Sequence, residues 1–170
     1  METLYDFFHA INTTLIDRGL EWMENTVRPA AVSNMISDMV AAAIAKHSNG
    51  LVENRQHNGH PDLIPRGVYA ADTVKAGTEG VEIKSTRGRV ADTHGAREGW
   101  ICQFNYRVDP EPLIAQRRPT IITHIFLARV TEAHFRRNVR RTERGTNTST
   151  LDRAGLVVLR QGLIYRDSPV

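Results

Sequence analysis

The chain has 170 residues, of which 41% are hydrophobic and 24% are charged. This composition is typical of a folded globular domain and excludes a disordered or fibrous chain. The single cysteine, Cys102, excludes an internal disulfide framework and favours a reducing compartment. No apolar run approaches the roughly 20 residues of a membrane span, and the first residues lack the basic segment of a signal peptide. We therefore expect one cytoplasmic domain, residues 1–170, with no membrane partner.

The charge is distributed unevenly along the chain. Lys and Arg total 22 against 19 Asp and Glu, for a net charge of +3, and only three of the 22 are lysines. Residues 1–50 hold six acidic and three basic residues, whereas residues 129–144 hold six arginines and two acids. A basic segment of this kind is a candidate footprint for a polyanion.

The first part of the chain, residues 1–50, predicts two helices. Apolar residues recur at helical spacing from Leu4 to Ile16, with Gly19 near the end of this helix. A second apolar stripe follows Pro29 and runs to Ile44, and Ser48 to Gly50 form a plausible C-terminal cap. We expect these faces to pack against the rest of the domain, with a dimer interface as the alternative.

The middle of the chain, residues 60–130, predicts a small sheet. Residues 54–65 are polar and indicate a loop, and residues 80–86 alternate between apolar and polar side chains, as a strand does. Residues 100–108 and 120–130 predict two further strands, the second central because it is more fully apolar. The last part, 131–170, predicts a basic helix at 131–142 and short extended segments at 155–160 and 162–166. The fold class is therefore α/β: a small mixed sheet flanked by helices, with an N-terminal helical pair.

Residues 61–84 contain the residues best suited to catalysis. Glu82 and Lys84 are two apart on a predicted strand, so their side chains project from the same face. Asp62, arriving from a neighbouring segment, would add a second carboxylate. Two carboxylates and a strand carbonyl are hard oxygen ligands that suit Mg²⁺. A bound Mg²⁺ would activate a water and neutralise charge on a phosphate, and Lys84 would orient or deprotonate that water.

Pro61-Asp62 followed by Glu82-Ile83-Lys84 resembles the signature of the PD-(D/E)xK nucleases, and the arrangement is similar to that of type II restriction endonucleases. The core of that family is a helix, a hairpin carrying the aspartate, a strand carrying the ExK residues, then a helix and a strand. The resemblance implies that Asp62, Glu82 and Lys84 are catalytic, with Asp62, Glu82 and the Ile83 carbonyl as metal ligands. It also implies Mg²⁺-dependent, sequence-specific cleavage of double-stranded DNA by a homodimer.

Other acids and histidines leave alternatives open at this site. Asp72 is a second candidate for the aspartate position, and Glu53 or Asp38 would supply a further acid from the N-terminal part. His57 and His60 would suit a zinc site, but we prefer a polar loop near the DNA or over the active site.

Basic and polar residues after the candidate catalytic strand and in the predicted basic helix are the expected DNA contacts. A structure-selective nuclease of the same fold, such as a Holliday-junction resolvase or repair nuclease, is the first alternative function, and a non-catalytic DNA-binding protein is the second. The presence of Lys84 beside Glu82 favours catalysis, since phosphate binding alone does not require it. The expected contacts are Ser85, Arg87, Arg89, His94, Arg97, Arg136, Arg137 and Arg140.

Overall fold

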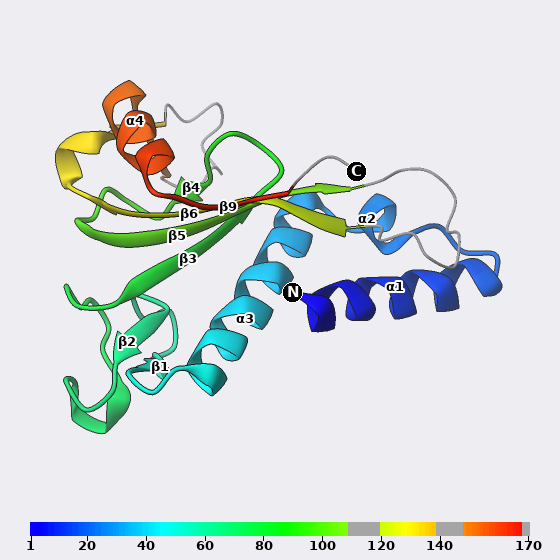
Figure 1. The fold of residues 1–170 in the computed structure, drawn as a ribbon, viewed down its shortest axis with the longest axis horizontal. Coiled ribbons are helices and arrows are strands. Elements are labelled where there is room, and N and C mark those ends of the chain that lie inside the picture. The colour runs from blue at the N-terminus through cyan, green and yellow to red at the C-terminus, as the bar shows by residue number, and fades with distance from the viewer. Residues whose placement is uncertain (109–119, 139–147, 168–170) are drawn as a thin grey trace, which may run out of the picture.

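The computed structural model describes residues 1–108, 120–138 and 148–167. It shows a mixed α/β architecture in which helices lie on both faces of a six-stranded sheet (Figure 1). Within the described residues, no helix combines the length and apolar character that a membrane span requires.

The N-terminal part is helical, as predicted. Helix α1 spans Glu2–Asp17 and α3 spans Pro29–His47, joined by the short helix α2, Met23–Thr26. Gly19 follows α1 with φ of +70°, a conformation that glycine adopts without strain. Pro29 is the first residue of α3, where its missing N–H would have had no helical partner.

The main sheet has the strand order β1-β2-β3-β5-β6-β9. Strands β3 and β5 are parallel, and all the other neighbouring pairs are antiparallel. The strands predicted at 80–86, 100–108, 120–130 and 162–166 are confirmed. The bounds are β1 Leu51–Glu53, β2 Leu63–Pro65, β3 Val81–Thr86, β5 Gly99–Val108, β6 Thr120–Val130 and β9 Leu163–Arg166.

A second, three-stranded sheet and helix α4 cover one face of the main sheet. The small sheet has the order β4-β8-β7, with bounds Asp92–Thr93 for β4, Ser149–Leu151 for β8 and Phe135–Arg137 for β7. Helix α4, Arg153–Gln161, follows β8 directly. Two 3-10 turns, η1 at Ala70–Asp72 and η2 at Glu132–His134, complete the described elements.

The prediction of a basic helix at 131–142 is wrong for residues 131–138, the part that the structure describes. The side chains of Thr131 and His134 close a single 3-10 turn, and β7 then pairs with β8, Arg136 opposite Thr150. Pairing with a strand that follows later in the chain therefore overrides the helix propensity of the arginines. Arg140 lies outside the described residues.

The extended segment predicted at 155–160 is also wrong, because these residues form most of α4. Asp152 caps this helix by accepting a hydrogen bond of 2.8 Å from the backbone of Gly155. The apolar run at 156–159 resembled a strand because its length and β-branched residues suit either structure. In the helix, Gly155 and Leu159 are buried one turn apart.

The connection between the parallel strands differs from the family core described above. That core has a helix between the ExK strand and the next strand, whereas residues 87–98 contain only the two-residue strand β4. Gln103 fastens this connection to the sheet: its side-chain Oε1 accepts from the Ala91 N–H at 3.0 Å, and its Nε2 donates to Asn105 Oδ1 at 2.7 Å. Gln103 is 1% exposed, so these hydrogen bonds satisfy a buried amide.

Two apolar cores lie on opposite faces of the main sheet (Figure 1). The larger core packs α1 and α3 against β3, β5 and β6, with Phe8, Ile36 and Ile83 at most 1% exposed. The smaller core joins Ile101 and Val130 to Leu151 and Leu159, beneath α4 and the small sheet. Both faces of the central strands are therefore partly buried, so polar side chains on these strands have little access to solvent.

Candidate active site

Strand β3 separates its side chains between a buried face and an open face. Ile83 and Ser85 are 1% and 7% exposed and face α3, where Ser37 Oγ donates a 3.1 Å hydrogen bond to Ser85 Oγ. Glu82 and Lys84 project from the other face, as their spacing predicted. Ser85, expected to contact DNA, is instead part of the packing between β3 and α3.

Asp62 reaches β3 from the residue just before β2. Its Oδ2 accepts a 2.8 Å hydrogen bond from the backbone N–H of Ile83, and Leu63 pairs with Val81. Gly80 permits this close approach, because a Cβ there would lie 2.1 Å from the Leu63 carbonyl oxygen, and its φ of +134° also favours glycine. The predicted convergence of Asp62 with Glu82 and Lys84 is therefore present in the structure.

The two carboxylate oxygens of Glu82 have different partners. Oε1 is ion-paired and hydrogen-bonded with Lys84 Nζ. His60 Nδ1 lies 2.7 Å from Oε2. This buried oxygen has no hydrogen bond of acceptable geometry within the described part of the chain, although the contact with His60 still favours the ionised form of Glu82. Glu82 thus keeps one buried oxygen available for a further partner.

The two carboxylates titrate in opposite directions. Burial, together with the charge of Glu82, raises the pKa of Asp62 from 3.8 to about 6. Burial also disfavours the charged form of Glu82, but the His60 contact and the Lys84 charge outweigh it and lower the pKa of Glu82 to about 2. Near neutral pH both carboxylates are ionised. Their mutual repulsion contributes to the raised pKa of Asp62.

His60 was not predicted as a member of the site. It lies in the loop before β2, and Asn54 holds that loop in place. The Asn54 side chain donates to the carbonyls of Pro61 and Val74 at 3.0 and 2.8 Å and accepts from the Val74 N–H at 3.0 Å. The only feature of the sequence that indicates a role for His60 at this site is its position next to Pro61-Asp62.

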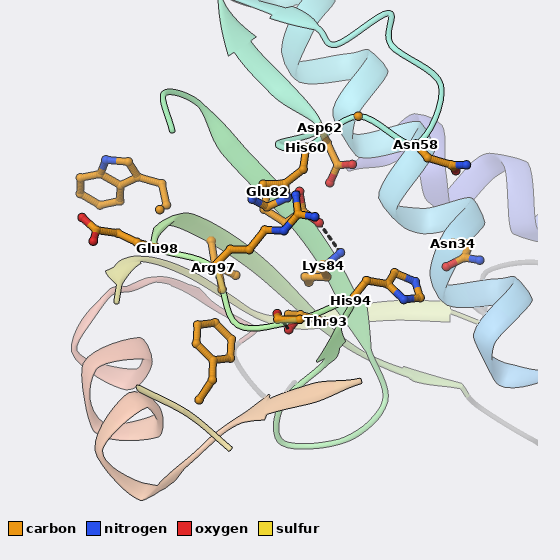
Figure 2. Close-up of a pocket in the computed structure, with 16 residues that line it drawn as sticks. Asn34, Asn58, His60, Asp62, Glu82, Lys84, Thr93, His94, Arg97 and Glu98 are labelled. Atoms are coloured by element: carbon orange, nitrogen blue, oxygen red, sulfur yellow. Dashed lines mark hydrogen bonds and ion pairs between the residues drawn. The ribbon is translucent and has the colours of Figure 1, made fainter. Parts of the chain in front are cut away.

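These side chains line a cavity of about 580 Å³ (Figure 2). Asp62, His60, Glu82 and Lys84 form one wall of the cavity. The 87–98 connection supplies further lining residues, among them His94 and Arg97 (Figure 2). The other residues that line it include Asn34, Asn58, Thr93, Glu98, Trp100 and Phe135.

The remaining predicted residues divide into three groups. His94 and Arg97 are exposed at the cavity, in agreement with a role near a ligand there. Arg87 and Arg137 are exposed elsewhere, and Arg89 and Arg136 line a different groove. The alternative acids do not line the cavity: Asp38 and Glu53 are exposed outside it, and Asp72 Oδ1 accepts from the Gly67 N–H at 2.9 Å within its own loop.

A divalent cation would have to rely on few side chains. Among the described residues, no three His, Cys, Asp or Glu side chains are arranged to hold a metal ion. Asp62, Glu82 and a backbone carbonyl fit Mg²⁺, since this ion retains several waters and uses one or two carboxylates. The lack of a well-formed hydrogen bond at Glu82 Oε2 and the repulsion between the carboxylates are the features that a cation would relieve.

Comparison of the chain with models of protein families, with curated proteins and with solved structures finds no match. The class of site therefore rests on the geometry of these residues and on the resemblance of their pattern.

Proposed function

We propose that this protein is a Mg²⁺-dependent DNA endonuclease whose active site comprises Asp62, Glu82 and Lys84. The observation that carries the proposal is their convergence on one wall of a single cavity, with Asp62 hydrogen-bonded to the strand that carries the other two. Such a group of two carboxylates and a lysine suits phosphodiester hydrolysis, because negative charge develops on the phosphate.

Asp62, Glu82 and the carbonyl of Ile83 would hold the Mg²⁺ ion. When bound, the ion supplies a water of lowered pKa and offsets charge on the phosphate. Lys84 is ion-paired with Glu82 through its Nζ. Its chemical role is then to donate a hydrogen bond to a phosphate oxygen or to the attacking water. His60, in contact with Glu82, is a positioning residue that restrains the carboxylate.

Double-stranded DNA is the proposed substrate, with a homodimer as the acting form. The exposed His94 and Arg97 at the cavity suit an anionic substrate. A dimer is proposed because each chain has one such site and a duplex has two strands to cut, so a two-fold protein would match a palindromic target. Sequence-specific cleavage in the manner of a type II restriction enzyme is the finer form of this proposal, and a structure-selective nuclease is its alternative.

The test is incubation of the purified protein with unmethylated phage DNA and Mg²⁺, resolved on a gel. Lys84→Ala and an EDTA lane should abolish cleavage. Lys46→Ala, which removes an exposed lysine from the last turn of α3, should leave cleavage intact. Discrete fragments would support sequence specificity, and a smear would support the structure-selective form. Intact linear and branched DNA with wild-type protein would contradict the proposal.

A further inference from the structure

A second groove, separate from the active-site cavity, is lined by arginines. It has a volume of about 570 Å³ and lies between α4, β7 and the connection after β3. Four arginines line it: Arg89, Arg136, Arg153 and Arg160. Its apolar floor is formed by Leu151 and Leu156. Arg153 and Arg160 lie at the two ends of α4, a helix that the sequence pattern did not predict.

The four arginines of this groove are without ion-pair partners within the described part of the chain. None of the four guanidinium groups makes an ion pair or a side-chain hydrogen bond there. The one acid in the groove, Asp152, caps α4 and can offset only one of the four charges. Four like charges around one groove repel one another. A bound anion would offset this repulsion.

Strand β7 lies between the groove and the active-site cavity. Phe135 lines the cavity, and the next residue, Arg136, lines the groove. Helix α4, which lines the groove, lies on the face of the main sheet opposite α1 and α3 (Figure 1). A duplex bound in the groove would therefore lie one strand away from the cavity.

We propose that this groove binds the phosphodiester backbone of duplex DNA and so anchors the substrate beside the active site. The choice of DNA rests on the proposed function, whereas the groove itself rests on the four unpaired arginines. One guanidinium group can donate two parallel hydrogen bonds to the oxygens of one phosphate. The apolar floor suits the sugars between the phosphates. A recessed groove accommodates a strand of phosphates better than it does the flat surface of a membrane.

The experiment measures binding without hydrolysis. A labelled duplex of about 20 base pairs is titrated with protein in EDTA, by fluorescence anisotropy, over salt concentrations from about 50 to about 300 mM. The test variant is Arg153→Gln with Arg160→Gln. The matched control is Arg18→Gln with Arg66→Gln, which removes the same charge from exposed positions outside the groove. Thermal melts establish that both variants fold.

The groove variant should bind about tenfold or more weakly, and the slope of log K against log salt should fall by about 2, for two lost phosphate contacts. The control should retain most of the affinity. Equal losses in both variants would overturn the proposal. Binding of wild type to anionic phosphatidylserine vesicles but not to the duplex would also overturn it.

Hydrolysis distinguishes this proposal from the proposed function. If wild type binds through the groove but cuts no DNA with Mg²⁺, the anchoring groove stands and the nuclease assignment fails. If wild type cuts DNA and the groove variant binds and cuts as well as the control, the nuclease assignment stands and the groove proposal fails.

Discussion

Two buried glutamates lie in this molecule in contrasting surroundings. Glu24, in α2, is 5% exposed, and both its oxygens accept hydrogen bonds: from Asn12 Nδ2 at 2.7 Å and from Thr120 Oγ1 at 2.6 Å. Glu82, in β3, has a side chain that is 12% exposed, pairs with Lys84 through one oxygen, and lacks a well-formed hydrogen bond at the other. Glu82 also borders the cavity of about 580 Å³.

The difference indicates what each carboxylate contributes. The hydrogen bonds of Glu24 fasten α1 and α2 to β6, so its burial contributes to stability. Glu82 is held in its ionised form by its contacts with Lys84 and His60, but its Oε2 lacks a well-formed hydrogen bond and the Asp62 carboxylate lies beside it. A buried oxygen without a hydrogen bond and a neighbouring carboxylate with a raised pKa cost stability and are typical of sites that bind a ligand. Four substitutions test this distinction.

The largest expected effect is on catalysis by Glu82→Gln. The amide keeps the shape of the side chain but removes the charge needed by a cation and by Lys84, so hydrolysis should fall by about 1,000-fold or more. Single-turnover cleavage of phage DNA measures this. Glu79→Gln, at an exposed position before β3, is the control and should cleave normally. Activity within tenfold of wild type would remove Glu82 from the active site.

Glu24→Ala should give the opposite profile. It leaves the donors of Asn12 and Thr120 buried without their acceptor, so the free energy of unfolding should fall by about 3 kcal/mol. Cleavage per folded molecule should be unchanged. Urea unfolding measures the loss, and Glu21→Ala, exposed in the same connection, should lose little. A marked loss of activity in folded Glu24→Ala would show that this network also serves the site.

Asp62→Asn tests whether the site itself costs stability. Because the pKa of Asp62 is about 6 in the folded protein and 3.8 ordinarily, the folded state binds this proton more tightly than the unfolded chain. The contribution of Asp62 to the stability of the fold therefore weakens as pH rises from about 4 to about 6. At pH 7 the ionised carboxylate destabilises the fold. Asparagine removes that cost and still accepts from the Ile83 N–H.

In metal-free buffer, Asp62→Asn should therefore be more stable than wild type by about 2 kcal/mol at pH 7. The gain should disappear near pH 4. Urea unfolding of both proteins at the two pH values measures this. Glu82, with its lowered pKa, loses stability in acid in both proteins. The difference between their free energies of unfolding cancels this shared loss. An equal gain at both pH values would mean that ionisation is not its cause.

The placement of the site was predictable where it depends on one strand and its neighbour. The period of two in residues 80–86 assigned Glu82 and Lys84 to one face, and the structure agrees. The same period assigns Ser85 to the buried face, so its expected contact with DNA conflicted with the strand prediction itself.

Residues that depend on distant partners were not predictable in this way. The link from Glu24 to Thr120 spans 96 positions, and the strand character of β7 depends on pairing with β8. His60 is held near Glu82 by hydrogen bonds between its loop and residues 74–77, including those of Asn54 to Val74 and of the His60 backbone to Lys75 and Gly77. Local patterns contain none of these pairings, since they are decided by tertiary contacts.

The smallest expected effect, from His60→Ala, shows how far the active-site environment extends. His60 contacts the one Glu82 oxygen that lacks a well-formed hydrogen bond, so its loss should leave the fold intact but free the carboxylate to move. Groups that restrain a metal-binding carboxylate typically change metal affinity by about 10- to 100-fold when removed. We therefore expect the Mg²⁺ concentration for half-maximal cleavage to rise about tenfold, with an unchanged melting temperature. His57→Ala, exposed in the same loop, should change neither. If His60→Ala lowered the melting temperature but left the Mg²⁺ dependence as in wild type, His60 would belong with Glu24 among the residues that serve stability.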